Sequence, residues 1–207
     1  MSSTFQSIRR PFDAIAQRIA SMSETRANRQ AARITDVLIS VVLLAAGLRL
    51  AHAHPAAAVL AGVSGLLLFT LVEYCFHRWM FHGSVPFFEP GHRRHHDNPL
   101  GDDAIPFFLP PLAILAIVAL CAAVMPAGFA LILTGGLATG YAIYGLSHDL
   151  IHTCHFRHPL GRRWAANHHI HHYHPDRNFG VSTPIWDIIL GTRHSPRRSS
   201  GRRTPLE

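Results

Sequence analysis

Histidine is the residue type in this sequence that is best placed to carry out chemistry. The 207 residues include 17 histidines, and five of these fall within the seven residues 168–174. Others gather in the runs EYCFHRWMFH, GHRRHHDNP and GLSHDLIHTCH. Neutral imidazole binds iron, zinc, copper and nickel alike, so clustered histidines indicate a metal site without naming the metal.

The spacing of the histidines predicts how their rings converge. Side chains three or four residues apart share one face of a helix, so each closely spaced set can point at one metal ion. His77 and His82 are five residues apart and diverge around an α-helix, which predicts that they serve different metals or that the helix ends between them. Two groups of five ligands on adjoining helix ends would hold two ions close together. The ten candidate ligands are His77, His82, His92, His95, His96, His148, His152, His168, His171 and His172.

The remaining histidines are interpreted as surface residues or as satisfied core residues. They are His52, His54, His155, His158, His169, His174 and His194. An alternative for the ten is a flexible histidine-rich tract that merely captures metal. Aromatic residues interleaved with the histidines, such as Trp79 and Trp164, are typical of packed structure and favour a defined two-metal site.

Four apolar blocks must position these histidines, at residues 37–50, 56–72, 104–125 and 127–147. With a helical rise of about 1.5 Å per residue, the last three are roughly 25 to 33 Å long, enough to cross a bilayer core. The first block is the shortest, and an interfacial or packed helix is the alternative there. The blocks predict an all-α integral membrane protein with about four transmembrane helices.

The distribution of arginine predicts the orientation in the membrane. All 19 basic residues are arginine: six precede the first block, three follow the second and nine follow the fourth, whereas Arg49 lies at a helix end. Basic residues collect on the cytoplasmic side, so both termini and the histidines are expected there. Residues 1–34 form a basic cytoplasmic arm and residues 193–207 an arginine-rich tail. Membrane orientation and anionic headgroups account for the net charge of +7, so no nucleic-acid partner is expected.

The histidine motifs match a known pattern in order and spacing. HRWMFH, HRRHH, HDLIH and HHIHH resemble the boxes HxxxxH, HxxHH, HxxxH and HxxHH of the fatty acid hydroxylase superfamily. This superfamily of integral-membrane di-iron enzymes includes fatty acid 2-hydroxylases, sterol desaturases and sterol C4-methyl oxidases. The segment NFGVSTPIWDIILGT looks like the one that follows the last box in many members.

The resemblance implies a fold, a cofactor and a reaction. Four transmembrane helices would carry a cytosolic helical cap, and residues 35–192 would form the membrane di-iron hydroxylase domain. The ten histidines above would bind two iron ions, with O2 as co-substrate. The expected enzyme is an oxidoreductase that hydroxylates or desaturates a lipid C–H bond, and an acyl lipid is favoured over the alternatives, a carotenoid or a sterol.

Four carboxylates close to the boxes are candidates for fixing the orientation of ligand rings. They are Glu73, Asp97, Asp149 and Asp187. Helix capping or ion pairing with neighbouring arginines is an equally good interpretation for any one of them.

The reaction also needs electrons. No flavin, nicotinamide or iron–sulfur motif is found, so we expect an external donor, a ferredoxin or cytochrome b5 with its reductase. The basic cytoplasmic face would dock this acidic partner through Arg162, Arg163, Arg197 and Arg198.

A membrane metal transporter or metal-binding sensor is the alternative from a different functional class. Transporters place their polar ligands near the bilayer midplane, where an ion must cross. Here the histidines lie at the ends of the apolar blocks. Their position therefore argues against transport.

Overall fold

A computed structural model describes residues 17–195 of the chain, and these residues form helices and connecting loops with no strand. Residues 17–23 are helical. The elements that follow are α2 (Arg26–Leu50), α3 (Pro55–Phe76), the π-helix η1 (His77–Phe81), α4 (Glu89–Asp97), α5 (Leu109–Ala122), α6 (Ala127–Thr153), α7 (Pro159–Tyr173) and α8 (Ile185–Ile189). Most of the 193–207 tail, including Arg197 and Arg198, and the first part of the 1–34 arm lie outside the described residues.

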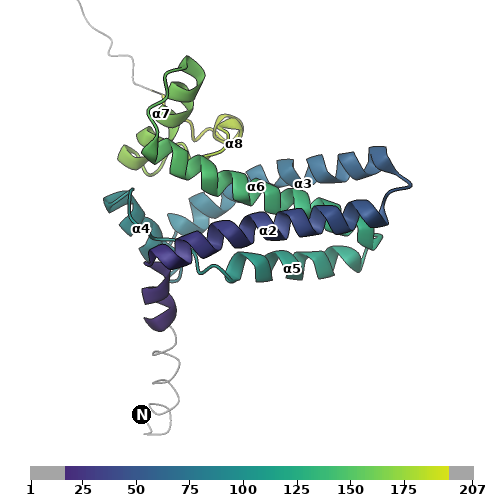
Figure 1. Ribbon diagram of the computed structural model, residues 1–207. Coiled ribbons are helices and arrows are strands. Elements are labelled where there is room, and N and C mark those ends of the chain that lie inside the picture. Colours follow the sequence, from purple (N-terminus) through teal and green to yellow (C-terminus); the bar gives the residue numbers. More distant parts are fainter. Residues whose placement is uncertain (1–16, 196–207) are drawn as a thin grey trace, which may run out of the picture.

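The four apolar helices lie side by side, and the shorter helices gather at one end of them (Figure 1). α6 is central, because it packs against α2, α3 and α5. Three helical stretches are long and apolar enough to cross a membrane, Arg26–Leu50, Pro55–Phe81 and Ala127–Thr153. The chain is thus an all-α protein with the features of a multi-pass membrane protein.

The third apolar block forms a shorter helix than its length predicts. α5 has 14 residues and is about 21 Å long, less than a bilayer core needs. Pro106 lacks a backbone N–H and disfavours helix in the residue before it, so residues 102–106 form a non-helical loop. Asn28 of α2 binds this loop, since its side chain contacts the Ala104 and Ile105 carbonyls at 3.3 Å.

The first apolar block belongs to a longer helix than its apolar residues indicate. α2 begins at Arg26, where the Thr25 side chain accepts a hydrogen bond from the Asn28 amide at 3.2 Å. This N-cap satisfies one of the free amides at the start of the helix. The resulting 25-residue helix is one of the three candidate spans.

Close contact between α3 and α6 depends on glycine. A Cβ atom on Gly65 would clash with the Leu133 carbonyl oxygen of α6, and one on Gly136 would clash with the Gly62 carbonyl oxygen of α3. Small residues let helix backbones approach closely within membranes. This contact fixes the end of α3, which leads into η1, relative to the end of α6.

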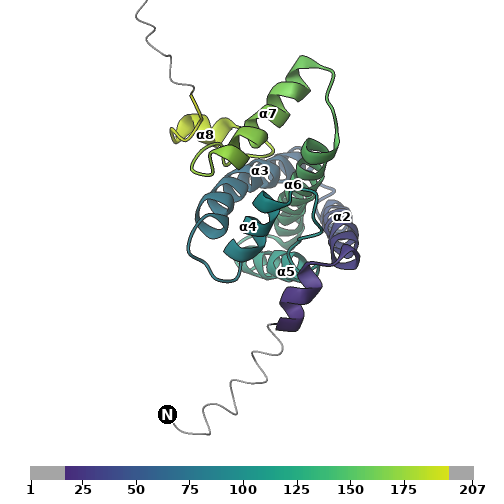
Figure 2. The ribbon, with the colours of Figure 1, turned by 90° about the vertical axis from the view of Figure 1, so that its left-hand side faces the viewer.

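The short helices form a cap at the end of the bundle. A small cluster of buried side chains, Ile151, Ala165 and Val181, joins α6 and α7 to the segment that follows α7. Trp164 packs beside this cluster and donates its indole N–H to the Val181 carbonyl at 2.8 Å. Figure 2, which views the bundle from the cap end, shows α4, α7 and α8 arranged around the ends of α3 and α6.

Candidate metal centre

Ten histidines converge in two groups at the cap end of the bundle. In each group the potential ligand atoms all lie within 4.8 Å of one another. Group 1 consists of His77, His82, His92, His96 and His171, and group 2 consists of His95, His148, His152, His168 and His172. The structure thus brings together all ten histidines that the sequence singled out.

The expectation that each closely spaced set points at one metal ion is wrong for His95 and His171. His95 of α4 joins the histidines of α6 and α7, and His171 of α7 joins those of η1 and α4. Residues four apart on a helix are separated by about 40° around the axis, whereas residues three apart point about 60° the other way. Each HxxHH box therefore gives its first and last histidines to one group and its middle histidine to the other.

The expectation for His77 and His82 is also wrong, because both belong to group 1. The helix does not end between them but continues as the π-helix η1, and the His82 amide donates to the His77 carbonyl at 3.2 Å. A π-helix repeats its hydrogen bonds every five residues, so residues i and i+5 lie on one face. The five-residue spacing was itself the signal for this geometry.

The distances within the groups fit metal ions. In group 1, the Nε2 atom of His92 lies 3.1, 2.9 and 3.1 Å from the Nε2 atoms of His77, His82 and His96. Two ligands at right angles around an ion, with bonds of about 2.1 Å, lie about 3.0 Å apart. In group 2, the His168 Nε2 atom lies 3.0 and 3.1 Å from those of its two neighbours, His152 and His172.

Backbone carbonyls fix the tautomers of two group 1 rings. His77 Nδ1 donates to the Phe179 carbonyl at 2.5 Å, and His171 Nδ1 donates to the Arg177 carbonyl at 2.7 Å. Because a carbonyl only accepts, the proton of each neutral ring is on Nδ1 and the Nε2 lone pair points into the group. This is the usual arrangement behind a metal-binding histidine.

A buried ring nitrogen in group 2 also fits an ion. His95 Nε2 is buried and has no hydrogen-bond partner among the described residues. Buried polar atoms are normally paired, and a metal ion would satisfy this one. The donor set and spacing of both groups therefore suit metal binding.

Burial keeps the rings of the cap in the form that binds metal. It lowers the pKa of His171 and of His172 to about 3, and that of His82 to about 4, from an ordinary value of 6.5. It also lowers the pKa of His95 to about 2. Neighbouring histidines lower these values further, since a second charged ring nearby would be repelled. The rings are therefore neutral near pH 7, with lone pairs free to bind.

Glu73 and Asp187 support the ligands indirectly. Asp187 is fully buried and accepts hydrogen bonds from the Phe179 and Gly180 amides, both at 2.8 Å. These amides flank the carbonyl that holds the His77 ring. Glu73 binds the next part of this segment, accepting from the Val181 amide at 2.6 Å.

Asp149 and Asp97 have different surroundings. Asp149 forms an ion pair with Arg33 and thereby joins the ends of α6 and α2. Asp97 is exposed at the end of α4. No hydrogen bond joins any of the four carboxylates to a ligand ring among residues 17–195, so Glu73 and Asp187 can act on the rings only through the backbone that they bind.

Sequence reasoning missed the residues that hold the segment behind the centre. Ser182 donates to Glu73 through its amide at 2.9 Å and also through its hydroxyl. Thr192 donates its hydroxyl to Asp187 at 2.7 Å, and Asn178 is buried with a positive φ of 55°. Asn is among the few residues that adopt this conformation readily, which is the one local signal for a turn here.

The histidines interpreted as structural lie outside both groups. His169 Nε2 contacts the Ile151 carbonyl at 3.3 Å, and His158 caps α7. The rings of His174 and His194 stack with centroids 4.4 Å apart. The His169 ring lies beside that of His152, with centroids 5.7 Å apart, but it is not one of the ligands that make up group 2.

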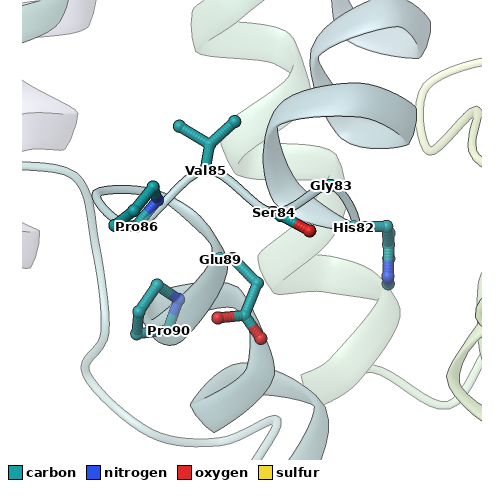
Figure 3. Close-up of a pocket in the computed structure, with 7 residues that line it drawn as sticks. All are labelled: His82, Gly83, Ser84, Val85, Pro86, Glu89 and Pro90. Atoms are coloured by element: carbon teal, nitrogen blue, oxygen red, sulfur yellow. The ribbon is translucent and has the colours of Figure 1, made fainter.

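An open hollow lies next to group 1, between the end of η1 and the start of α4 (Figure 3). Its volume is about 500 Å³, and it is lined by His82, Gly83, Ser84, Val85, Pro86, Glu89 and Pro90. Since His82 forms part of its wall, this hollow borders group 1.

Comparison with known proteins agrees with this geometry. The fatty acid hydroxylase family profile matches residues 62–192. The chain is 28% identical over 141 residues to the dihydroceramide fatty acyl 2-hydroxylase FAH1 of Arabidopsis thaliana, covering 63% of this chain and 59% of that protein. It is 31% identical over 147 residues to the fatty acid 2-hydroxylase of Rattus norvegicus, covering 63% of this chain and 38% of that protein. The chain thus corresponds to only part of the length of these relatives.

A solved structure has the same fold. It is described as full-length scs7p with only the hydroxylase domain visible, and it superposes with a TM-score of 0.70 at 24% identity, covering 90% of this chain and 71% of that one. The histidine groups, the helical bundle beneath them and the match over 62–192 lead to one conclusion: the chain belongs to the fatty acid hydroxylase family.

Proposed function

We propose that this protein is a membrane-bound di-iron enzyme that hydroxylates carbon 2 of the acyl chain of a ceramide-type lipid. The observation that carries the proposal is the convergence of ten imidazoles in two adjoining groups. Membership of the family and the names of the relatives support the reaction and favour hydroxylation over desaturation.

The two groups would hold one iron ion each. Five neutral imidazoles per group form a donor set that would suit iron. When bound, the iron pair supplies the redox chemistry by which O2 oxidises an unactivated C–H bond. The carbonyls of Phe179 and Arg177 keep the Nε2 atoms of the His77 and His171 rings turned into group 1.

The position of the groups favours carbon 2 over the middle of an acyl chain. His77 and His148 lie near the same ends of two candidate spans, so the centre lies at the edge of the apolar bundle. Carbon 2 is next to the polar carbonyl of the lipid, which stays near the membrane surface. A mid-chain carbon would have to be drawn out of the bilayer to reach the same site.

The proposed topology has four crossings with both termini and the centre in the cytoplasm. The loop before α5 contacts α2 near its start, because the Thr35 hydroxyl donates to the Phe107 carbonyl at 3.2 Å. At the other end, the start of α6 meets the end of α2, where Gly128 lies beside Ala51. α5 and its preceding loop together thus run along α2, and the arginine distribution supports the orientation. The division into a 1–34 arm, a 35–192 catalytic domain and a 193–207 tail is part of this proposal.

When one oxygen atom of O2 is inserted into a C–H bond, the other oxygen atom is reduced to water. This reaction consumes two electrons and two protons. We propose that an acidic ferredoxin or cytochrome b5 with its reductase delivers the electrons. Arg162 and Arg163 support a docking site on α7, where they line a hollow of about 430 Å³ together with Pro159 and Ala166. Weaker turnover at higher ionic strength is the expected sign of such docking.

The test is lipid analysis of cells that express the protein under ¹⁸O2. We expect 2-hydroxylated acyl lipids that carry one labelled oxygen, and their loss in His168→Ala. His169→Ala is the matched control and retains activity, since His169 lies outside both groups. A loss of two hydrogens without added oxygen would identify a desaturase instead. Purified protein that holds two irons per chain yet oxidises no lipid with reductant present would refute the proposal.

A metal sensor or transporter would behave differently in the same preparation. Metal analysis beside oxygen consumption separates the two classes. An oxygenase retains two ions and takes up O2 only with lipid and reductant, whereas a sensor exchanges its metal reversibly and consumes none.

A further inference from the structure

The helix α8 presents an apolar surface that no other described part of the chain covers. Ile185, Ile188 and Ile189 have 47%, 55% and 61% of their surface exposed, and the next residue, Leu190, has 46% exposed. Four adjoining aliphatic side chains on such a short segment form a contiguous patch. In water this patch would be unfavourable, and patches of this kind mark sites of contact with proteins or membranes.

The opposite side of α8 is polar and faces inward. Asp187 is fully buried, and its carboxylate binds two backbone amides and the Thr192 hydroxyl. Its charge is therefore directed toward the cap and away from the patch. A helix with a satisfied polar side and a bare aliphatic side is suited to lie in a membrane surface.

A hydrogen bond sets the depth of α8 along the bundle. The Trp186 indole N–H donates to the Thr70 hydroxyl of α3 at 2.9 Å. Thr70 lies inside the candidate span Pro55–Phe81, seven residues before His77, which is about 10 Å along a helix.

A second marker gives the same depth. The ion pair between Arg33 and Asp149 marks the polar boundary of the bundle. Gly140 of α6 is in contact with Phe69, the residue before Thr70. Gly140 is nine residues from Asp149 along α6, which corresponds to roughly 13 Å. The Trp186 indole thus reaches the level of the apolar part of the bundle.

The patch is continuous with a surface of α3 that faces outward. Val63, Leu67 and Thr70 share a helical face, since they follow one another at spacings of four and three residues. The exposed fractions of Val63 and Leu67 are 47% and 61%. In Figures 1 and 2, α8 lies beside the cap end of α3. The same environment that covers Val63 and Leu67 of a membrane-spanning helix therefore borders α8.

We propose that α8 and Leu190 are immersed in the leaflet nearest the metal groups, where the aliphatic patch contacts lipid acyl chains. The cap then touches the membrane at two places, through the ends of the spanning helices and through α8. Trp186 and the inward-facing Asp187 are placed as expected at such a boundary, since tryptophan favours the membrane interface. This inference concerns position in the bilayer and does not depend on the proposed reaction.

Spin labels can measure this depth in the full-length protein. Nitroxides are attached at Ile188→Cys and Ile189→Cys in phosphatidylcholine–phosphatidylglycerol vesicles, and their accessibility to O2 and to a water-soluble nickel chelate is compared. Leu67→Cys is the reference for lipid. The aqueous control is Leu100→Cys, because the 67% exposure of Leu100 is close to that of Ile189. The next residue, Gly101, accepts a hydrogen bond from Arg29, which lies one helical turn beyond Arg33 on the side away from the bilayer. The native cysteines replaced by alanine are Cys75, Cys121 and Cys154.

We expect both α8 labels to match the lipid reference, with an O2-to-nickel accessibility ratio several-fold above that of the Leu100 label. A ratio equal to the Leu100 value would place α8 in water and overturn the proposal. Low accessibility to both reagents would also overturn it, since protein would then cover the patch. Two bound metal ions per chain confirm that each labelled variant is folded, so activity is not needed for the result.

Discussion

Asp187→Asn is expected to weaken metal binding without any change to a ligand. Asp187 uses both carboxylate oxygens, one for the Phe179 amide and one for the Gly180 amide, each at 2.8 Å. Asparagine keeps one oxygen and replaces the other with an NH2 group, so one buried amide loses its acceptor and faces another donor. An unsatisfied buried donor costs about 1–3 kcal/mol.

The cost reaches the metal through a single carbonyl. Phe179 also accepts the Nδ1–H of His77, so movement of this peptide turns the ring away from group 1. Partners behind a ligand are worth about 10- to 100-fold in metal affinity, which corresponds to about 1.4–2.8 kcal/mol. The two magnitudes agree, and we expect the ion of group 1 to bind 10- to 100-fold more weakly.

The assay is chelator titration of the iron-loaded protein in lipid nanodiscs, with metal counted per chain. Wild-type protein should release both ions at high chelator concentration, whereas Asp187→Asn should release one ion much earlier. Asp97→Asn is the matched control, because Asp97 also neighbours a box but is exposed. Wild-type affinity in Asp187→Asn, or an equal loss in Asp97→Asn, would refute the reasoning.

Three further predictions concern the bundle, η1 and the rings. Gly65→Ala should lower the bound metal below two ions per chain, because the added Cβ clashes with α6. The control Gly145→Ala should bind metal normally, since a Cβ there meets nothing within 4 Å. Equal metal content in the two variants would contradict this packing argument. Insertion of one alanine after Met80 should place the two rings of His77 and His82 six residues apart, turn His82 out of group 1 and release one ion. Full retention of both ions would contradict the role given to the spacing in η1. His171 has a pKa of about 3 in the folded protein and an ordinary value of 6.5, so the unfolded chain binds more protons between these values. Metal-free protein should therefore lose stability as the pH falls below about 6.5, and the midpoint of thermal unfolding measures this loss. A constant midpoint down to pH 4 would contradict the assignment of neutral rings.

Apolar length and histidine spacing predicted much of this molecule. The blocks at 56–72 and 127–147 lie within α3 and α6, and all ten histidines of the boxes converge. The apolar pattern did not predict the helix bounds where a single residue changes the backbone. Pro106 precedes a shortened helix, and Thr25 caps a helix that begins well before its apolar residues. These effects are visible in the sequence but need a structural frame to be recognised.

The composition of the histidine groups depends on geometry that the sequence specifies only indirectly. His95 and His171 change groups because a one-residue step turns a side chain by about 100°, and the partner helices decide which metal lies there. The carbonyls of Phe179 and Arg177 carry no sequence signal, since every residue has one. Their positions follow only from the path of the chain after α7.

The exchange of histidines between boxes has a consequence for assembly. Without α7, group 1 keeps four donors and group 2 keeps three; without α4, these numbers are reversed. Neither group is complete until both short helices have docked, so a first bound ion would help to organise the site of the second. The buried aliphatic cluster beneath α7 is small, Ile151, Ala165 and Val181, so bound ions would add cross-links between α7 and the rest of the cap. In the apoprotein, amide hydrogens of α4 and α7 should therefore exchange far sooner than those of α6.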